Sequence, residues 1–167
     1  MAIYRNKNRD EKKNRIQNEW PKASSKLFKA LNIPKKQLED FEHSLVGYVV
    51  LPGSPEYKKD LTIPGWLTPY SAKPQMIVYC KTPDDVRQCL NLANKYKLWV
   101  TTRSGGHSFA GYSLNSGMVI DLSNFNQVTV DPKLKRARIG PGAQFQKINS
   151  ILEFPYKLHL PGPNVPY

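Results

Sequence analysis

The chain has 167 residues, which suits about one compact domain, because domains commonly hold ~100 to 200 residues, and it excludes a large two-domain enzyme. Hydrophobic residues make up 40% and aromatic residues 11% of the sequence, a composition typical of a folded protein with a core. The formal net charge is +12, and residues 1–40 carry 11 Lys and Arg against 5 Asp and Glu. A positive field attracts nucleic acids, membrane surfaces and anionic ligands alike, so charge does not choose among them.

Two absences shape the first expectations. Residues 1–15 lack the apolar stretch of a secretory signal, and no run of about 18 apolar residues occurs, so we expect a cytoplasmic protein with no membrane partner. Cysteine is scarce, and Cys80 and Cys89 fall on a predicted strand and the helix after it. This spacing favours two buried thiols over a disulfide framework.

The first third of the chain predicts one helix and one strand before a long loop. Residues 10–20 are charged with little apolar periodicity, which is typical of a frayed helix or a disordered tail. A helix is predicted after Pro34, with a stop at Gly47 and a buried face at helical spacing. That face consists of Leu38, Phe41 and Leu45. Residues 48–51 predict a strand, and the proline-containing residues 58–75 predict a loop.

The clearest unit is strand, helix, strand. Residues 76–80 predict a strand, and Thr82-Pro83-Asp84-Asp85 then supplies an N-cap hydroxyl, a proline at the first helical position and two acids for the positive end of a helix dipole. Residues 98–102, rich in β-branched and aromatic side chains, predict the next strand. The apolar stripe expected on the helix is Val86, Leu90 and Ala93.

The last third predicts a glycine-rich loop, a strand, a hairpin and a helix. The loop covers residues 104–117, and the strand covers residues 118–122. A turn at residues 131–134 separates two further strands that would add antiparallel partners to the sheet. The final helix has Phe145, Ile148 and Leu152 on one face. The expected fold class is α/β (α+β), a small mixed sheet with packed helices.

The loop after the second strand of that unit has the residue types of an anion site. Gly105 and Gly106 lack a Cβ, so successive backbone N–H groups can turn inward, while Arg103 adds charge and Ser104 and Ser108 add hydroxyl donors. The pattern is neither a P-loop nor the Rossmann glycine fingerprint. Taken alone, Gly-Gly-His is also compatible with an ordinary tight turn and an unremarkable histidine.

The surrounding sequence resembles a known family. Residues 74–152, which include KPQMIVYCKTPDDVRQCLNLANKYKLWVTTRSGGHSFAGYSLNSGMVIDLSNFNQV and later IGPGAQF, closely resemble the PCMH-type FAD-binding domain of the vanillyl-alcohol-oxidase superfamily. Berberine-bridge-enzyme-like oxidases are the most similar members, and VGYVVLPGSPEY at residues 46–57 resembles their entry strand and turn. The resemblance implies a flavoprotein oxidoreductase that binds FAD.

The resemblance also implies roles for individual residues. His107 would be bonded through its imidazole to the flavin 8α-methyl carbon, and a histidine suits this link because its neutral nitrogen is nucleophilic. Residues 103–108 would wrap the pyrophosphate. Five further positions would extend the loop or lie near the cofactor: Gly111, Ser113, Gly140, Gly142 and Ala143. In this family the flavin oxidises an alcohol, sugar or alkaloid substrate and passes the electrons to dioxygen.

The sequence departs from the family at its end. Relatives continue through a second flavin-linking cysteine, which neither cysteine here matches, so a doubly linked flavin is not expected. The rest of the FAD-binding domain, the substrate domain and the catalytic base would all lie beyond residue 167. We therefore assign no catalytic residue and expect no turnover by this chain alone. A fragment of a longer gene, a degenerate reading frame and one piece of a split assembly with a missing C-terminal half all stay open.

The expected domain organisation is a basic leader at residues 1–33, helical or disordered, and a partial FAD-binding domain at residues 34–167 with its core at 70–155. One alternative function is that the leader binds nucleic acid or another anionic surface, although a solvated tail is the better interpretation. Another is a non-functional remnant. His43 and His159 lack a second ligand at helical spacing, so no metal is expected. The three tryptophans are interpreted as packing residues: Trp20, Trp66 and Trp99.

Overall fold

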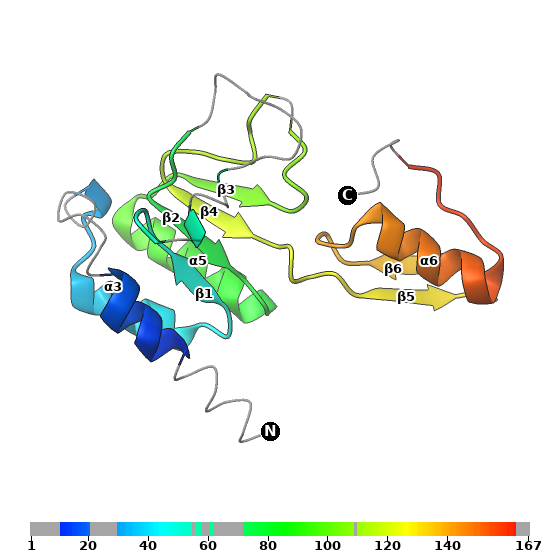
Figure 1. Ribbon diagram of the computed structural model, residues 1–167, viewed down its shortest axis with the longest axis horizontal. Helices are drawn as coiled ribbons and strands as arrows, with labels where there is room; N and C mark the ends of the chain where they lie inside the picture. Colours follow the sequence, from blue (N-terminus) through cyan, green and yellow to red (C-terminus); the bar gives the residue numbers. More distant parts are fainter. Residues whose placement is uncertain are drawn as a thin grey trace.

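The computed structural model describes residues 11–20, 30–54, 56–57, 61, 72–108 and 110–162. Within them, two groups of elements are visible in Figure 1: a four-stranded sheet with its helices, and a hairpin with the last helix. The elements in chain order are η1 (Arg15–Glu19), α3 (Lys35–Ser44), β1 (Tyr48–Val50), β2 (Met76–Tyr79), α5 (Pro83–Tyr96), β3 (Val100–Arg103), β4 (Met118–Asp121), β5 (Val128–Asp131), β6 (Arg136–Ile139) and α6 (Phe145–Tyr156).

The larger sheet has the strand order β1-β2-β4-β3. Strand β4 runs parallel to both of its neighbours, β2 and β3, and β1 pairs antiparallel with β2. Because β2 and β3 are joined through α5 and lie on either side of β4, they form the predicted strand, helix, strand unit with one strand inserted between them. The small mixed sheet with packed helices is thereby confirmed.

Alternating side chains of the sheet divide its core into two clusters. On one face, strand residues such as Val78 and Ile120 pack against α3, α5 and Trp20. On the other face, a smaller cluster joins Ile77 and Val119 to Tyr57 and its neighbours. The first face therefore carries the helices and the larger of the two clusters.

The predicted start of α5 is confirmed. The Thr82 hydroxyl accepts from the Asp85 N–H at 3.2 Å, and the Asp85 carboxylate accepts in return from the Thr82 N–H at 3.1 Å, which is a capping box. The same carboxylate accepts from the N–H groups of Val46, Gly47 and Lys81. Asp85 therefore ties the loop between α3 and β1 to the beginning of α5.

The apolar stripe predicted for α5 is partly wrong. Leu90 is 47% exposed, whereas the buried residues of this helix include Cys89, Leu92 and Ala93. The sulfur atoms of Cys80 and Cys89 lie 3.7 Å apart, and both thiols are free and buried, as the sequence predicts. The buried face of α5 therefore includes Ala93 from the predicted stripe, but Cys89 and Leu92 take the place predicted for Leu90.

The hairpin was correctly predicted, but its place in the fold was not. Strands β5 and β6 pair antiparallel with each other in a separate two-stranded sheet. Ile148 and Leu152 of α6 are buried, and Figure 1 shows α6 beside the hairpin and away from the four-stranded sheet. Among the described residues, the antiparallel partner in the larger sheet is β1 instead.

Residues 11–20, which we call the N-terminal helix, are packed against the body of the protein. Trp20 is 1% exposed and belongs to the main core, and Lys12 is 5% exposed with its Nζ donating to the carbonyls of Glu42 and Leu45. The sequence predicts a frayed helix or a solvated tail here, whereas in the structure residues 11–20 are anchored to the core through Lys12 and Trp20. Residues 1–10 lie outside the described part of the chain.

The predicted packing role of the tryptophans has a mixed outcome. Trp20 is buried as predicted, whereas Trp99, just before β3, is 75% exposed, so that interpretation is wrong for Trp99. Trp66 and most of the loop predicted at residues 58–75 lie outside the described residues.

Candidate cofactor-binding site

The glycine loop, residues 104–108, leaves the carboxyl end of β3, next to the carboxyl end of the parallel strand β4. Ligands of parallel sheets bind outside this end of the strands. Gly106 has φ +76°, a left-handed conformation that residues with a Cβ rarely adopt. Ser104, Gly105 and His107 are exposed, so the loop can be reached from solvent.

The space around Gly105 explains the first glycine of the pair. A Cβ at residue 105 would lie 2.9 Å from Cδ2 of His107, closer than side chains normally approach. At Gly106 the nearest heavy atom to a Cβ is 3.9 Å away, so conformation and not space restricts that position. Gly105 makes room for the imidazole of His107, while Gly106 provides the turn.

Ser108 begins the turn that continues the loop. Its carbonyl accepts from the Gly111 N–H at 3.0 Å, and its Oγ accepts from the Tyr112 N–H at 3.1 Å. The hydroxyl of Thr101 on β3 donates to the carbonyl of Tyr112 at 2.7 Å, which fastens the turn to the strand. Ser113 is buried just beyond it. The positions predicted from Arg103 to Ser113 thus form one connected segment.

Arg103 is fixed at the first residue before the loop. It is 8% exposed, and its Nε donates to Oδ2 of Asp121 on β4 at 2.6 Å. Its Nη2 also donates to the hydroxyl of Tyr79 on β2 at 3.2 Å. Asp121, itself buried, accepts from the Ser123 N–H through its other oxygen. Arg103 therefore carries a charge that the sheet already holds in place.

The predicted positions after β6 lie against the exit of β4. The Gly142 N–H donates to the carbonyl of Phe125, and a Cβ at residue 142 would lie 2.3 Å from the carbonyl oxygen of Leu122. The N–H of Ala143 closes a turn onto the carbonyl of Gly140. Since the Leu122 N–H donates to the carbonyl of Arg103 at 2.8 Å, this turn and the start of the glycine loop meet at Leu122.

Sequence reasoning missed the residues that support Arg103. Tyr79 and Asp121 each stand at the last position of a parallel strand, in register with Arg103 through β4. The signal in the sequence is a polar residue that ends an apolar run, in MIVY and in MVID. The pairing register that brings them together depends on strand order, which the sequence did not give.

The described geometry suits an anionic group. The loop has a left-handed glycine, a second glycine that leaves space for the His107 ring, and exposed hydroxyl and imidazole groups, all next to the Arg103–Asp121 ion pair. Successive backbone N–H groups around a left-handed residue can form concave sites for phosphates. The loop therefore fits a phosphate-bearing cofactor.

The residues that the structure describes hold no group of three His, Cys, Asp or Glu side chains placed to bind a metal ion. They also hold no helix whose length and apolar content would let it span a bilayer.

The glycine loop lies at the carboxyl ends of the parallel strands β3 and β4, the end at which open α/β sheets bind nucleotide cofactors. Residues 74–162, a little over half of the sequence, match the family described as FAD binding domain. The chain belongs to this family, and the resemblance to the vanillyl-alcohol-oxidase superfamily is confirmed.

Several curated proteins are similar to the chain. An uncharacterized FAD-linked oxidoreductase of Bacillus subtilis is 34% identical over 119 residues, which are 70% of this chain and 26% of that protein. The (R)-6-hydroxynicotine oxidase of Paenarthrobacter nicotinovorans is 33% identical over 59% of this chain and 21% of its own length. The chain thus spans about a quarter or less of the curated relatives it matches.

Solved structures agree with this assignment. The 6-hydroxy-D-nicotine oxidase of Arthrobacter nicotinovorans matches with a TM-score of 0.59 and 29% identity, covering 64% of this chain and 23% of that one. A berberine bridge enzyme-like protein of Physcomitrella patens matches with a TM-score of 0.64 and 23% identity, covering 70% and 25%. The second likeness concerns the fold alone.

Proposed function

We propose that this chain is the FAD-binding portion of a flavin-dependent oxidase, and that residues 103–108 hold the pyrophosphate of FAD. The observation that carries the proposal is the left-handed Gly106 in a loop at the carboxyl end of β3, inside the segment that matches the FAD binding domain family. Backbone N–H groups of the glycine loop would bind the phosphates, and the hydroxyls of Ser104 and Ser108 would add donors. Together with Gly111 and Ser113, which follow in the chain, residues 103–108 would form the first wall of the cofactor site.

The turn Gly140–Ala143 would form a second wall. It lies against Leu122, whose N–H is bonded to Arg103, so the two segments reach the same end of the sheet. Gly140 and Gly142 leave no room for a side chain beside the backbone of residues 122–125, which keeps this turn close to β4. Both walls can then contact one extended cofactor.

His107 would carry the covalent link to the flavin. One ring nitrogen of His107 would replace a hydrogen of the 8α-methyl carbon, with both protons leaving to solvent and two electrons passing through the flavin to dioxygen. The exposure of His107 and the space that Gly105 leaves beside its ring make the imidazole accessible for this bond. When bound, the flavin would supply hydride acceptance, oxidising an alcohol, sugar or alkaloid substrate.

The remaining parts of the proposal concern the protein as a whole. Because the chain spans about a quarter of its relatives, substrate oxidation would need parts that residues 1–167 do not contain. We propose a basic leader at residues 1–33 and a partial FAD-binding domain at residues 34–167. A cytoplasmic location and a small-molecule substrate stay predictions from the sequence.

The test is to express the chain with added FAD, denature it in SDS and excite the protein band with ultraviolet light. Covalent flavin on the wild-type band that is lost in His107→Ala would support the link. His43→Ala, which removes an exposed histidine from α3, is the matched control and should keep the fluorescence.

Other outcomes separate the parts of the proposal. Fluorescence that persists in His107→Ala would put the link on another residue. Retention of FAD on gel filtration without fluorescence after SDS would contradict the link but not cofactor binding. A folded chain that binds no FAD at millimolar concentration would contradict both.

A further inference from the structure

One row of side chains crosses all four strands of the larger sheet. The register pairs Tyr48 with Tyr79, Tyr79 with Asp121, and Asp121 with Arg103. Residues paired in register project from the same face, so these four side chains stand side by side. The row ends at Arg103, immediately before the glycine loop.

The members of the row are in contact. The rings of Tyr48 and Tyr79 are stacked, with centroids 4.9 Å apart and an interplanar angle of 17°. The Cζ of Arg103 lies 5.9 Å from the centroid of the Tyr79 ring, in addition to the hydrogen bond between Nη2 and the hydroxyl. The Arg103–Asp121 ion pair completes the row. Each side chain therefore restricts the position of the next.

Arg15 extends this row beyond the sheet. Its Cζ lies 4.5 Å from the centroid of the Tyr48 ring, and its Nη2 lies 3.5 Å from Oε1 of the buried Glu42. Arg15 belongs to the N-terminal helix, which Lys12 fastens to the end of α3 and Trp20 fastens to the core. The guanidinium is thus held over the tyrosine by an element that is itself anchored.

We propose that the N-terminal helix belongs to the support of the cofactor site, with Arg15, Tyr48 and Tyr79 acting as positioning residues for Arg103 and the glycine loop. The proposal rests on the proposed FAD-binding function of that loop. The N-terminal helix, whose basic composition alone would suggest nucleic-acid binding, would then support the cofactor site from the β1 edge of the sheet, opposite β3.

The contacts link Arg15 to Arg103 in three steps. The Arg15 cation lies over the Tyr48 ring, the Tyr48 ring stacks on Tyr79, and the Tyr79 hydroxyl accepts from Arg103. Each contact favours one placement of the Arg103 guanidinium. Arg103 in turn begins the loop, and its carbonyl is bonded to Leu122 at the second wall of the site. Removing Arg15 should therefore loosen residues 104–108, although no atom of Arg15 is required to touch them.

The alternative is that Arg15 only helps the helix to pack. The position of Tyr48 and Tyr79 between Arg15 and Arg103 does not distinguish these two roles, whereas a double-mutant cycle does. Arg15→Met removes the cation, and Tyr79→Phe keeps the stacked ring but removes the hydroxyl bonded to Arg103. If the row transmits the effect, Arg15→Met should change the loop less once the Tyr79 hydroxyl is gone.

The readout is amide hydrogen exchange of residues 104–108 in the full chain without FAD, with α6 as the internal reference, followed by FAD titration. For Arg15→Met we expect loop exchange and the FAD dissociation constant each to rise about fivefold, the scale of one cation–π contact. In the Tyr79→Phe background the same substitution should change both by less than about twofold. Arg15→Lys should restore most of the wild-type behaviour.

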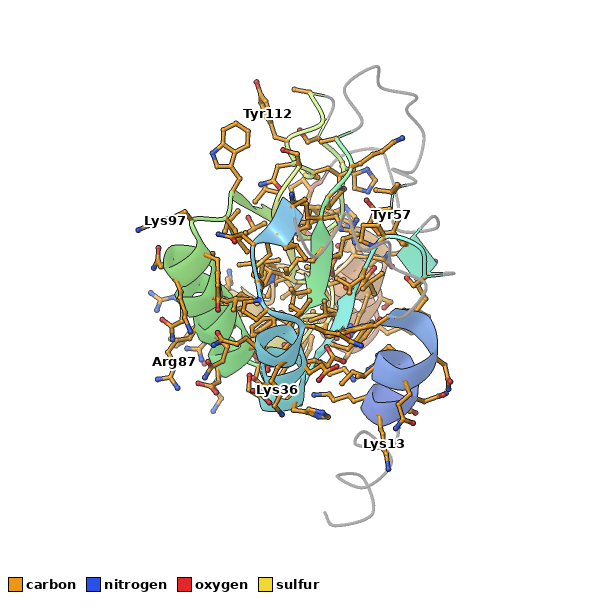
Figure 2. All side chains as sticks on the ribbon, turned by 90° about the vertical axis from the view of Figure 1, so that its left-hand side faces the viewer. Lys13, Lys36, Tyr57, Arg87, Lys97 and Tyr112 are labelled. Atoms are coloured by element: carbon orange, nitrogen blue, oxygen red, sulfur yellow. The ribbon has the colours of Figure 1, made fainter. Side chains whose placement is uncertain are left out.

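Lys13→Met is the matched control. Lys13 is exposed on the same helix, and Figure 2 shows it at the opposite end of the molecule from Tyr112 of the loop segment. It should leave loop exchange unchanged. Should Arg15→Met fail to fold, Tyr48→Leu breaks the same contact from the sheet side and is measured in the same way.

Equal loop exchange in a folded Arg15→Met variant and the wild type would overturn the proposal, as would full additivity with Tyr79→Phe. Because exchange is measured without the cofactor, the row can be supported even if the chain binds no FAD. In that case the proposed function fails and the positioning role stands.

Discussion

Nε of Arg103 donates to Oδ2 of Asp121 at 2.6 Å, from one parallel strand to its neighbour, and both side chains are buried. The ion pair lies at the end of β3, where the glycine loop begins. A buried charge that loses its partner is strongly destabilising, because nothing else offsets its desolvation.

Asp121→Asn should therefore lower the free energy of unfolding by about 3 kcal/mol, since it removes the carboxylate that pairs with the buried Arg103 cation. Urea denaturation followed by circular dichroism measures this. The control is Asp40→Asn, which breaks the exposed Lys36–Asp40 pair and should cost about 0.5 kcal/mol or less. Equal effects of the two substitutions would contradict the role given to Asp121.

Glu42 should make stability depend on pH. Burial raises the pKa of this carboxyl from 4.5 to about 7, and this outweighs the opposing effects of Arg15, the Val49 N–H and Lys12. The folded state binds the proton more tightly than the unfolded state, so the contribution of Glu42 to stability is complete below pH 4.5. It is lost as the pH rises through about 7, a change of about 3 kcal/mol.

Glu42→Gln should flatten this part of the stability profile. Thermal unfolding at pH 5 and pH 8 measures it, and the difference between the two should shrink relative to the wild type. Glu39→Gln, on the same helix but paired with Lys35 nearer the surface, should keep the wild-type difference. A wild-type profile in Glu42→Gln would show that other groups cause the pH dependence.

The Asp85 carboxylate should be needed for the start of α5. Asp85→Ala leaves four backbone N–H groups without their acceptor and should cost about 3 kcal/mol. The neighbouring Asp84 is exposed and pairs with the exposed Arg87, so Asp84→Ala should cost about 1 kcal/mol or less. Chemical denaturation of both variants gives the comparison.

Alanine substitutions at the two loop glycines should impair the cofactor site for different reasons. Gly106→Ala forces a Cβ into φ +76°, which should cost about 1 kcal/mol of stability and weaken FAD binding. Gly105→Ala has no such backbone restriction but puts a Cβ against the His107 ring. It should lower covalent flavin fluorescence while leaving the unfolding midpoint nearly unchanged. A wild-type level of attached flavin in Gly105→Ala would contradict this geometry.

The cysteines should be unreactive in the folded chain. The hydrogen bond with Cys80, followed by burial, raises the pKa of the Cys89 thiol, and both side chains are 0% exposed. Since the thiolate is the reactive form, titration with a disulfide reagent should find almost no reactive thiol before denaturation and two afterwards. Asn91→Cys, exposed on the same helix, should add one fast-reacting thiol.

Elements set by local chemistry could be predicted. The cap of α5 depends on Thr82, Pro83 and Asp85, which lie within four positions of one another, so the sequence alone indicates the start. The helix after Pro34 and the hairpin around residues 131–134 have the same local character.

Features set by distant partners could not be predicted. The buried face of α5 depends on which strands lie beneath it, and this leaves Leu90 exposed and Cys89 buried. The N-terminal helix is mostly polar by composition, but Lys12 is buried because the carbonyls at the end of α3 accept its hydrogen bonds. Sequence periodicity alone predicts neither the buried face of α5 nor the burial of Lys12.

The same division holds for the candidate site. The glycine loop could be found from its residue types and from the family resemblance, since both are contiguous in the sequence. Its support could not, because Tyr79, Arg103 and Asp121 come from three strands whose neighbours are set by a crossover connection.

The insertion of β4 between β2 and β3 has a consequence for how the protein is made. Strands β2 and β3 share no ladder, and β4 is the strand that pairs with both of them. A nascent chain that ends before residue 118 therefore has the glycine loop but lacks the strand that brings β3 and β2 together. The loop is synthesised before the framework that shapes it, so a ribosome-stalled chain should acquire its native arrangement only once Met118–Asp121 has emerged.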